Sequence, residues 1–237
     1  MTLADMQFIS PDLRLVFAEI FVLAMACLML LADALINDKK RTVSYGLSLI
    51  TLFGAAVLSI ASAVLGQSAT EHSFSGMVVS DLLGLVLKLS LYIVVALSLV
   101  YSRSYVLARP QMARGEYYTL TLFATLGMMV MICASHMLSI YVGLELLSLS
   151  LYALVALNRD SKSATEAAMK YFVLGALASG MLLYGISMVY GATGTLELRG
   201  IFEVIGKEEA TPVILSFGLV FIVAAVAFKL GAVPFHM

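Results

Sequence analysis

The feature that most limits how this chain can fold is a series of long apolar windows separated by short polar segments. A lipid hydrocarbon core about 30 Å thick needs roughly 20 apolar residues per helix, because an α-helix rises about 1.5 Å per residue. The fold class that we predict is an all-α polytopic membrane protein with about seven transmembrane helices. The predicted spans are residues 13–36, 43–65, 81–101, 117–134, 137–157, 166–190 and 212–235.

The overall composition supports a membrane protein and argues against nucleic-acid binding. Hydrophobic residues make up 62% and charged residues 12% of the 237 residues, outside the usual ranges of a soluble domain. The formal net charge is -1, and the sequence contains no basic patch with interleaved aromatic residues. We therefore predict that the lipid bilayer surrounds the chain and that nucleic acid is not a partner.

The basic residues between the predicted spans alternate from loop to loop. The first, third and fifth loops carry Lys and Arg, whereas the second and fourth have none and the sixth mixes Arg199 and Lys207 with acidic residues. By the positive-inside rule, the odd loops lie in the cytoplasm. We therefore expect the N-terminus on the outer side of the membrane.

Two ionisable residues lie deep inside predicted spans, on different helices. Glu145 is near the middle of the fifth span, and Lys229 lies in the seventh, shortly before Pro234. A charge at membrane depth costs about 2.5–3.5 kcal/mol on insertion scales, so it usually faces a protein interior or a water-filled path. Pro234 is also expected to disrupt the helix that carries Lys229, because a proline cannot donate a backbone hydrogen bond. We predict that both residues belong to an ion path, although a permanent ion pair that only fixes helix register is an open alternative for Glu145.

Two further residues are candidates for proton transfer. Lys170 lies one turn into the sixth span, but Glu166 precedes it by four residues, so a local ion pair and a functional lysine are both open. His236 follows the proline and is a possible relay, since imidazole titrates near neutral pH.

Other charged residues lie near the ends of spans. Lys88 follows Asp81 by seven residues on the same helix face, and we expect a local pair between them. Glu19 and Asp33 are near the two ends of the first span, where we expect an interfacial position.

A carboxylate and an ammonium group on separate helices can act as a proton switch. Together both stay charged, whereas apart in a low dielectric each tends toward its neutral form. The sequence contains no nucleotide loop, flavin fingerprint or iron–sulfur cysteine set, and no His or Met spacing typical of a metal site. We therefore expect no cofactor in this chain and an energy source in a partner.

Three segments carry a resemblance to a known family: HMLSIYVGLELLSLSLYAL at 136–154, ATEAAMKYFVLG at 164–175 and FKLGAVPFH at 228–236. They closely resemble the antiporter-like membrane subunits of bacterial respiratory NADH:quinone oxidoreductase, complex I. The first two segments are more similar to the subunit N type than to the L and M types. The third is shared with multisubunit cation/proton antiporters, which are the alternative function; an assembly or scaffold role is a third.

The resemblance implies a function, a location and partners. Glu145, Lys170 and Lys229 would take part in proton translocation across a bacterial inner membrane, with a periplasmic N-terminus and a seventh helix that breaks near Pro234. Other membrane subunits would form a hetero-oligomer with this chain. The partner subunits would carry NADH, FMN, iron–sulfur clusters and quinone.

The resemblance also implies a domain organisation. Family members contain two inverted helix repeats, as many transporters do. We predict one transmembrane domain over residues 1–237, with three initial helices at 13–101 and an incomplete first five-helix repeat at 117–237. The sequence stops just after the predicted break, so we expect a truncated chain that supplies the N-terminal half of an antiporter-like fold.

Overall fold

A computed structural model describes residues 12–35, 42–65, 70–109, 115–207 and 211–233. Helices dominate this part of the chain, and one small antiparallel hairpin pairs β1 with β2. In chain order the elements are a 3-10 turn at Leu13–Val16, α1 (Phe17–Leu35), α2 (Thr42–Leu65), β1 (Glu71–Ser73), β2 (Val78–Ser80), α3 (Leu82–Leu107), α4 (Glu116–Ile132), α5 (Met137–Val155), α6 (Lys162–Thr193), α7 (Leu198–Gly206) and α8 (Pro212–Lys229).

The predicted membrane fold is confirmed. Within the described residues, 6 helices are long and apolar enough to cross a membrane, and α4 is a shorter apolar helix of 17 residues. Together they match the seven predicted spans, although α6 begins earlier than expected and α8 ends at Lys229. Large apolar side chains such as Phe53 (73% exposed) and Val220 (64% exposed) face outward, as lipid contact requires.

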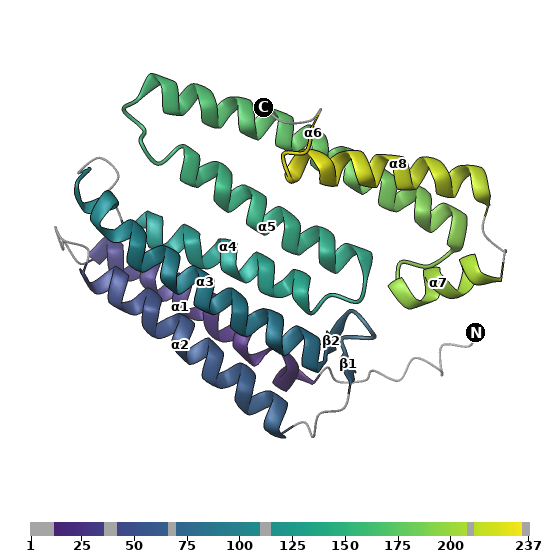
Figure 1. The fold of residues 1–237 in the computed structure, drawn as a ribbon, viewed down its shortest axis with the longest axis horizontal. Helices are drawn as coiled ribbons and strands as arrows, with labels where there is room; N and C mark the ends of the chain where they lie inside the picture. Colours follow the sequence, from purple (N-terminus) through teal and green to yellow (C-terminus); the bar gives the residue numbers. More distant parts are fainter. Residues whose placement is uncertain (1–11, 36–41, 66–69, 110–114, 208–210, 234–237) are drawn as a thin grey trace.

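The helices form two packed groups joined through α5. Helices α1 to α4 pack around a core that includes Val22, Met29, Leu99 and Leu122. A smaller cluster between α6 and α8 contains Leu182, Ile186 and Ala225. Figure 1 shows α5 lying between α4 on one side and the α6–α8 pair on the other.

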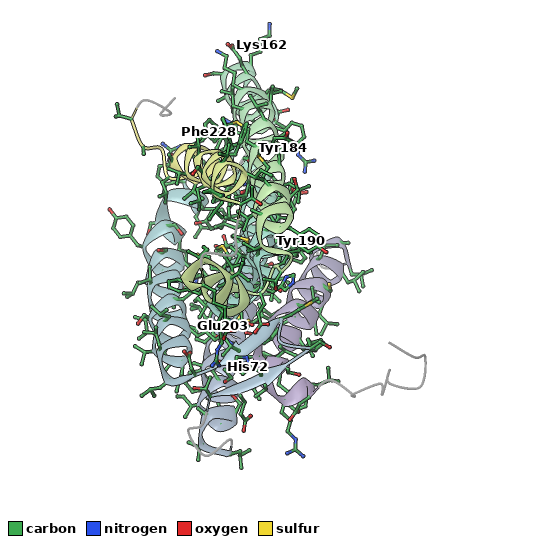
Figure 2. All side chains as sticks on the ribbon, turned by 90° about the vertical axis from the view of Figure 1, so that its right-hand side faces the viewer. His72, Lys162, Tyr184, Tyr190, Glu203 and Phe228 are labelled. Carbon is green, nitrogen blue, oxygen red and sulfur yellow. The ribbon has the colours of Figure 1, made fainter. Side chains whose placement is uncertain are left out.

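The second, fourth and sixth connections between the predicted spans meet at one end of the bundle. This is expected if successive spans cross the membrane in opposite directions. Val79 N donates to the Cys133 carbonyl (2.8 Å), which joins the hairpin to the turn between α4 and α5. Met137 N donates to the Leu196 carbonyl (2.9 Å), which joins that turn to the segment before α7. Figure 2 views the molecule from the right-hand side of Figure 1, where this end lies, with Glu203 of α7 above His72 of β1.

Glycines set how closely several helices approach. A Cβ added at Gly185 of α6 would lie 2.8 Å from the Gly218 carbonyl of α8, so the two backbones touch. A Cβ at Gly175 would clash with the Tyr152 hydroxyl of α5, whereas Gly180 has nothing within 4 Å. Close packing of α6 therefore depends on Gly175 and Gly185 but not on Gly180.

The expected pair of Asp81 and Lys88 is wrong, and two further features near the ends of helices were not predicted. Asp81 does not pair with Lys88; it caps α3 by accepting a hydrogen bond from Gly84 N (2.7 Å), which satisfies a free donor of the first turn. Glu19, in the first turn of α1, is only 6% exposed and pairs with Lys88. The sixth loop contains a short amphipathic helix, α7, which is too short to give a membrane-length apolar window.

Candidate functional site

Two of the predicted residues meet where α5, α6 and α8 come together. Glu145 is at the middle of α5, and Lys229 is the last residue of α8. The Nζ atom of Lys229 lies 3.4 Å from Oε1 of Glu145, and the two side chains are 10% and 23% exposed. The fold thus forms a largely buried ion pair from residues that are 84 positions apart.

Each charged group also has a serine hydroxyl as a partner. Lys229 Nζ donates to Ser148 Oγ over 2.7 Å, while Ser148 donates its own proton to the Leu144 carbonyl. The Ser179 hydroxyl of α6 donates to Oε1 of Glu145. Glu145 is therefore bonded to both α6 and α8, and the site connects three helices.

The two serines were not among the predicted site residues. Ser148 follows Glu145 by three residues, so the helical period already placed it on the same face of α5. Ser179 is 34 positions from Glu145 and lies on a different helix, α6. Helical spacing is therefore a signal that could have identified Ser148, whereas Ser179 required the packing of α6 against α5.

The end of α8 favours a positive charge at Lys229. The carbonyl groups at a helix C-terminus carry a partial negative charge, which stabilises a nearby cation. After Lys229 the chain turns away: Gly231 has a φ of 65°, and Ala232 N donates to the Ala227 carbonyl over 2.9 Å. This turn lies just before Pro234, near which a break was predicted. Pro234 and His236 lie outside the described residues, so the relay role of His236 stays a prediction.

Lys170 lies apart from the ion pair. Its Nζ is 2.6 Å from Oε1 of Glu166, and both side chains are well exposed. The local ion pair that the four-residue spacing allowed is therefore formed. An open groove of about 620 Å³ runs between α6 and α8 and is lined by Lys170, Tyr171, Leu174 and Lys229, among others. The structure therefore places both lysines on one groove without bringing them into contact.

Comparisons with known proteins agree with this arrangement. The family described as "NADH:quinone oxidoreductase/Mrp antiporter, TM" matches residues 134–237, which include Glu145, Lys170 and Lys229. NADH-quinone oxidoreductase subunit N from Thiobacillus denitrificans is 57% identical over 237 residues, which are 100% of this chain and 47% of the relative. Over its whole length the chain is therefore similar to subunit N, and its residues 134–237 match the antiporter-like family model. A second subunit N, from Azoarcus sp., is 54% identical over 98% of this chain and 46% of its own length.

Two solved structures share the fold of this chain. A chain of respiratory complex I from Thermus thermophilus has a TM-score of 0.72 and 28% identity, covering 93% of this chain and 45% of its own. A chain of an archaeal membrane-bound sulfane sulfur reductase has a TM-score of 0.78 at 22% identity, which shows the fold alone. The chain spans about half the length of the curated subunit N relatives that it matches.

Proposed function

We propose that this chain forms part of a proton-translocating membrane subunit of respiratory NADH:quinone oxidoreductase. Its role would be to move protons across a bacterial inner membrane, coupled to electron transfer from NADH to quinone in other subunits. The observation that carries the proposal is the buried pair of Glu145 and Lys229 on separate helices of an apolar bundle. The subunit N relatives support the same function.

The ion pair provides a means of coupling movement to protonation. While Lys229 lies against Glu145, each charge stabilises the other. If the two side chains swing apart in a low-dielectric interior, the neutral forms of both groups are favoured. Lys229 then releases a proton to a water or acceptor on its side, and Glu145 takes one up.

The serines allow the pair to separate without leaving its members unsatisfied. Ser148 accepts a hydrogen bond from Lys229, and Ser179 donates one to Glu145. A buried polar group that loses its last partner costs about 1–3 kcal/mol, and a charged group costs more. The hydroxyl groups therefore lower the free energy of the separated state.

The groove beside α6 and α8 is the proposed access route to Lys229. Lys170 lies at this groove and would pass protons toward Lys229, and His236 would continue the relay after the helix break. The partners of the chain would be other membrane subunits in a hetero-oligomer. NADH, FMN, iron–sulfur clusters and quinone would be held by partner subunits, and the N-terminus would be periplasmic.

The test is Glu145→Gln in the full-length protein, assembled in its native complex and reconstituted into vesicles. We expect this change to reduce the protons translocated per NADH oxidised, measured with a pH-sensitive dye, because the amide cannot carry the charge. Glu116→Gln is the matched control, since Glu116 makes an exposed pair with Arg159 (2.9 Å). An unchanged proton-to-electron ratio in the Glu145→Gln complex would reject the switch and favour a scaffold role.

The second candidate is a subunit of a multisubunit cation/proton antiporter, because the matched family includes Mrp antiporters. A chain of the Mrp complex from Dietzia has a TM-score of 0.71 at 18% identity, which shows only a shared fold. Co-purification separates the two functions. Flavin- and cluster-containing partners support the oxidoreductase, whereas sodium-dependent proton flux in vesicles without those partners supports the antiporter.

A further inference from the structure

A second buried acid–base pair lies within the first three helices, separate from Glu145 and Lys229. Glu19 is in the first turn of α1, and Lys88 is two turns into α3. Oε1 of Glu19 and Nζ of Lys88 are 2.5 Å apart, and the side chains are 8% and 12% exposed. Both carboxylate oxygens are buried and accept no hydrogen bond from the described residues, so Glu19 and Lys88 form an ion pair without hydrogen-bond geometry.

Titratable and polar groups face this pair from the elements packed against it. Tyr92 lies one turn beyond Lys88 on α3, and its hydroxyl is 3.1 Å from Ser59 Oγ of α2. Cys133, at the end of α4, is near enough for both charges of the pair to act on its thiol. Neither Tyr92 nor Cys133 is charged at neutral pH, so the charge of the pair is balanced internally.

A small cavity adjoins Lys88. Its volume is about 20 Å³, and its lining includes Ser59, Ser62, Asp81, Lys88 and Cys133. A buried water needs about 10–15 Å³ and two to four polar partners, so this cavity is large enough for one water molecule. A lysine ammonium has three donors. A water in the cavity would solvate the ammonium group of Lys88.

We propose that Glu19, Lys88 and one water in this cavity form a second proton-binding site. Transfer of a proton from Lys88 to Glu19 breaks an N–H bond, forms an O–H bond and converts the buried ion pair into a neutral pair. At higher pH the carboxyl O–H bond breaks and its proton passes to water, which leaves a carboxylate beside a neutral amine; uptake of a proton from water reverses this step. The neutral pair avoids the desolvation of two charges, which offsets much of their attraction in a buried site.

Exchange of this proton takes place at the end of the bundle that carries the hairpin. Asp81, Lys88 and Tyr92 share one face of α3, since they are separated by seven and four residues. Asp81 and the β2 residues Val79 and Ser80 line the same cavity as Lys88, so the cavity leads from the pair toward the hairpin.

The experiment is infrared titration of the full-length protein in its native membrane assembly. We expect a pH-dependent signal of a protonated carboxyl group that is lost in Glu19→Gln and kept in Glu145→Gln. A carboxyl signal that does not change with pH, or that Glu19→Gln leaves in place, overturns the proposal.

Lys88→Arg keeps the test decisive if Glu19→Gln does not assemble. A guanidinium retains the positive charge but does not release its proton in a protein. A proton-sharing pair therefore loses its pH-dependent carboxyl signal in Lys88→Arg, although the assembly stays intact. A permanent ion pair would never have shown the signal, and its assembly would tolerate arginine equally well. Ala63→Val, which narrows the cavity, is expected to shift the titration by displacing the water, and an unshifted curve would contradict the water site.

Discussion

The Lys229 ammonium group is held more closely by the Ser148 hydroxyl, at 2.7 Å, than by the Glu145 carboxylate, at 3.4 Å. Hydrogen bonds from an ammonium group are charge-assisted and stronger than those between neutral groups. Ser148 therefore supports Lys229 whether or not the carboxylate is close. The ion pair can open while its lysine stays hydrogen-bonded.

Ser148→Ala should weaken proton translocation by removing this support. Hydrogen bonds to charged groups contribute about 1.5–3 kcal/mol, so we expect a decrease of roughly tenfold or more in the translocation rate of the reconstituted complex. Ser150→Ala is the control, because Ser150 is also buried on α5 and bonds only to the Leu146 carbonyl. Equal rates in the two variants would show that the Ser148 contact has no role in transport.

Lys229→Ala should impair proton pumping and coupled quinone reduction more than Lys88→Ala does. Lys229 lies on the open groove and contacts both Glu145 and Ser148, whereas the cavity beside Lys88 is far smaller. The measurement is NADH oxidation together with proton uptake in membrane vesicles containing each variant. Similar losses in both variants would show that Lys229 is no more important for proton pumping than Lys88.

Gly185→Ala should force α6 and α8 apart. The added Cβ would lie 2.8 Å from the Gly218 carbonyl, and overpacking of this kind costs about 1–3 kcal/mol. We expect a lower thermal unfolding temperature for the detergent-solubilised protein. Gly180→Ala is matched to it, because nothing lies within 4 Å of its Cβ, and it should leave stability unchanged or slightly raised. A destabilised Gly180→Ala with a normal Gly185→Ala would contradict the packing described.

Lys170→Gln should lower the proton translocation rate while leaving the Glu145–Lys229 pair intact, because Lys170 reaches that pair only through the groove. Lys162→Gln removes an exposed charge from the first residue of the same helix and serves as the control. Both variants should assemble normally, as judged by gel filtration. If Lys170→Gln translocates protons as fast as Lys162→Gln, Lys170 acts only through its surface pair with Glu166.

The helices could be predicted from sequence because each one has to satisfy the same lipid thickness. Window length and hydropathy predicted seven spans, and the structure places helices at all of them. Length carries no information about α7, whose amphipathic turns lie in a loop between two spans. The hairpin was missed for a similar reason, since three-residue strands give too few alternating positions to identify.

The site could be predicted only in part because its partners come from distant helices. The depth of Glu145 and Lys229 in apolar segments indicated that each needed a partner, and the structure shows that they partner one another. Position along the helix was misleading for Glu19, which is near the start of α1 yet is buried in the bundle in which α1 packs against α2 and α4. Its pairing with Lys88 depends on the three-dimensional position of the helices, which local spacing does not determine.

The bonding of Glu145 to α6 and α8 at once has a mechanical consequence. The carboxylate is fixed to α5, yet its two outside contacts belong to different helices. A slide of one helix by about 1 Å, common in switching proteins, would stretch one contact and spare the other. A movement of α6 would therefore change the contact of the carboxylate with Ser179, whereas a movement of α8 would change its contact with Lys229. The electrostatic environment of Glu145 would differ between the two cases.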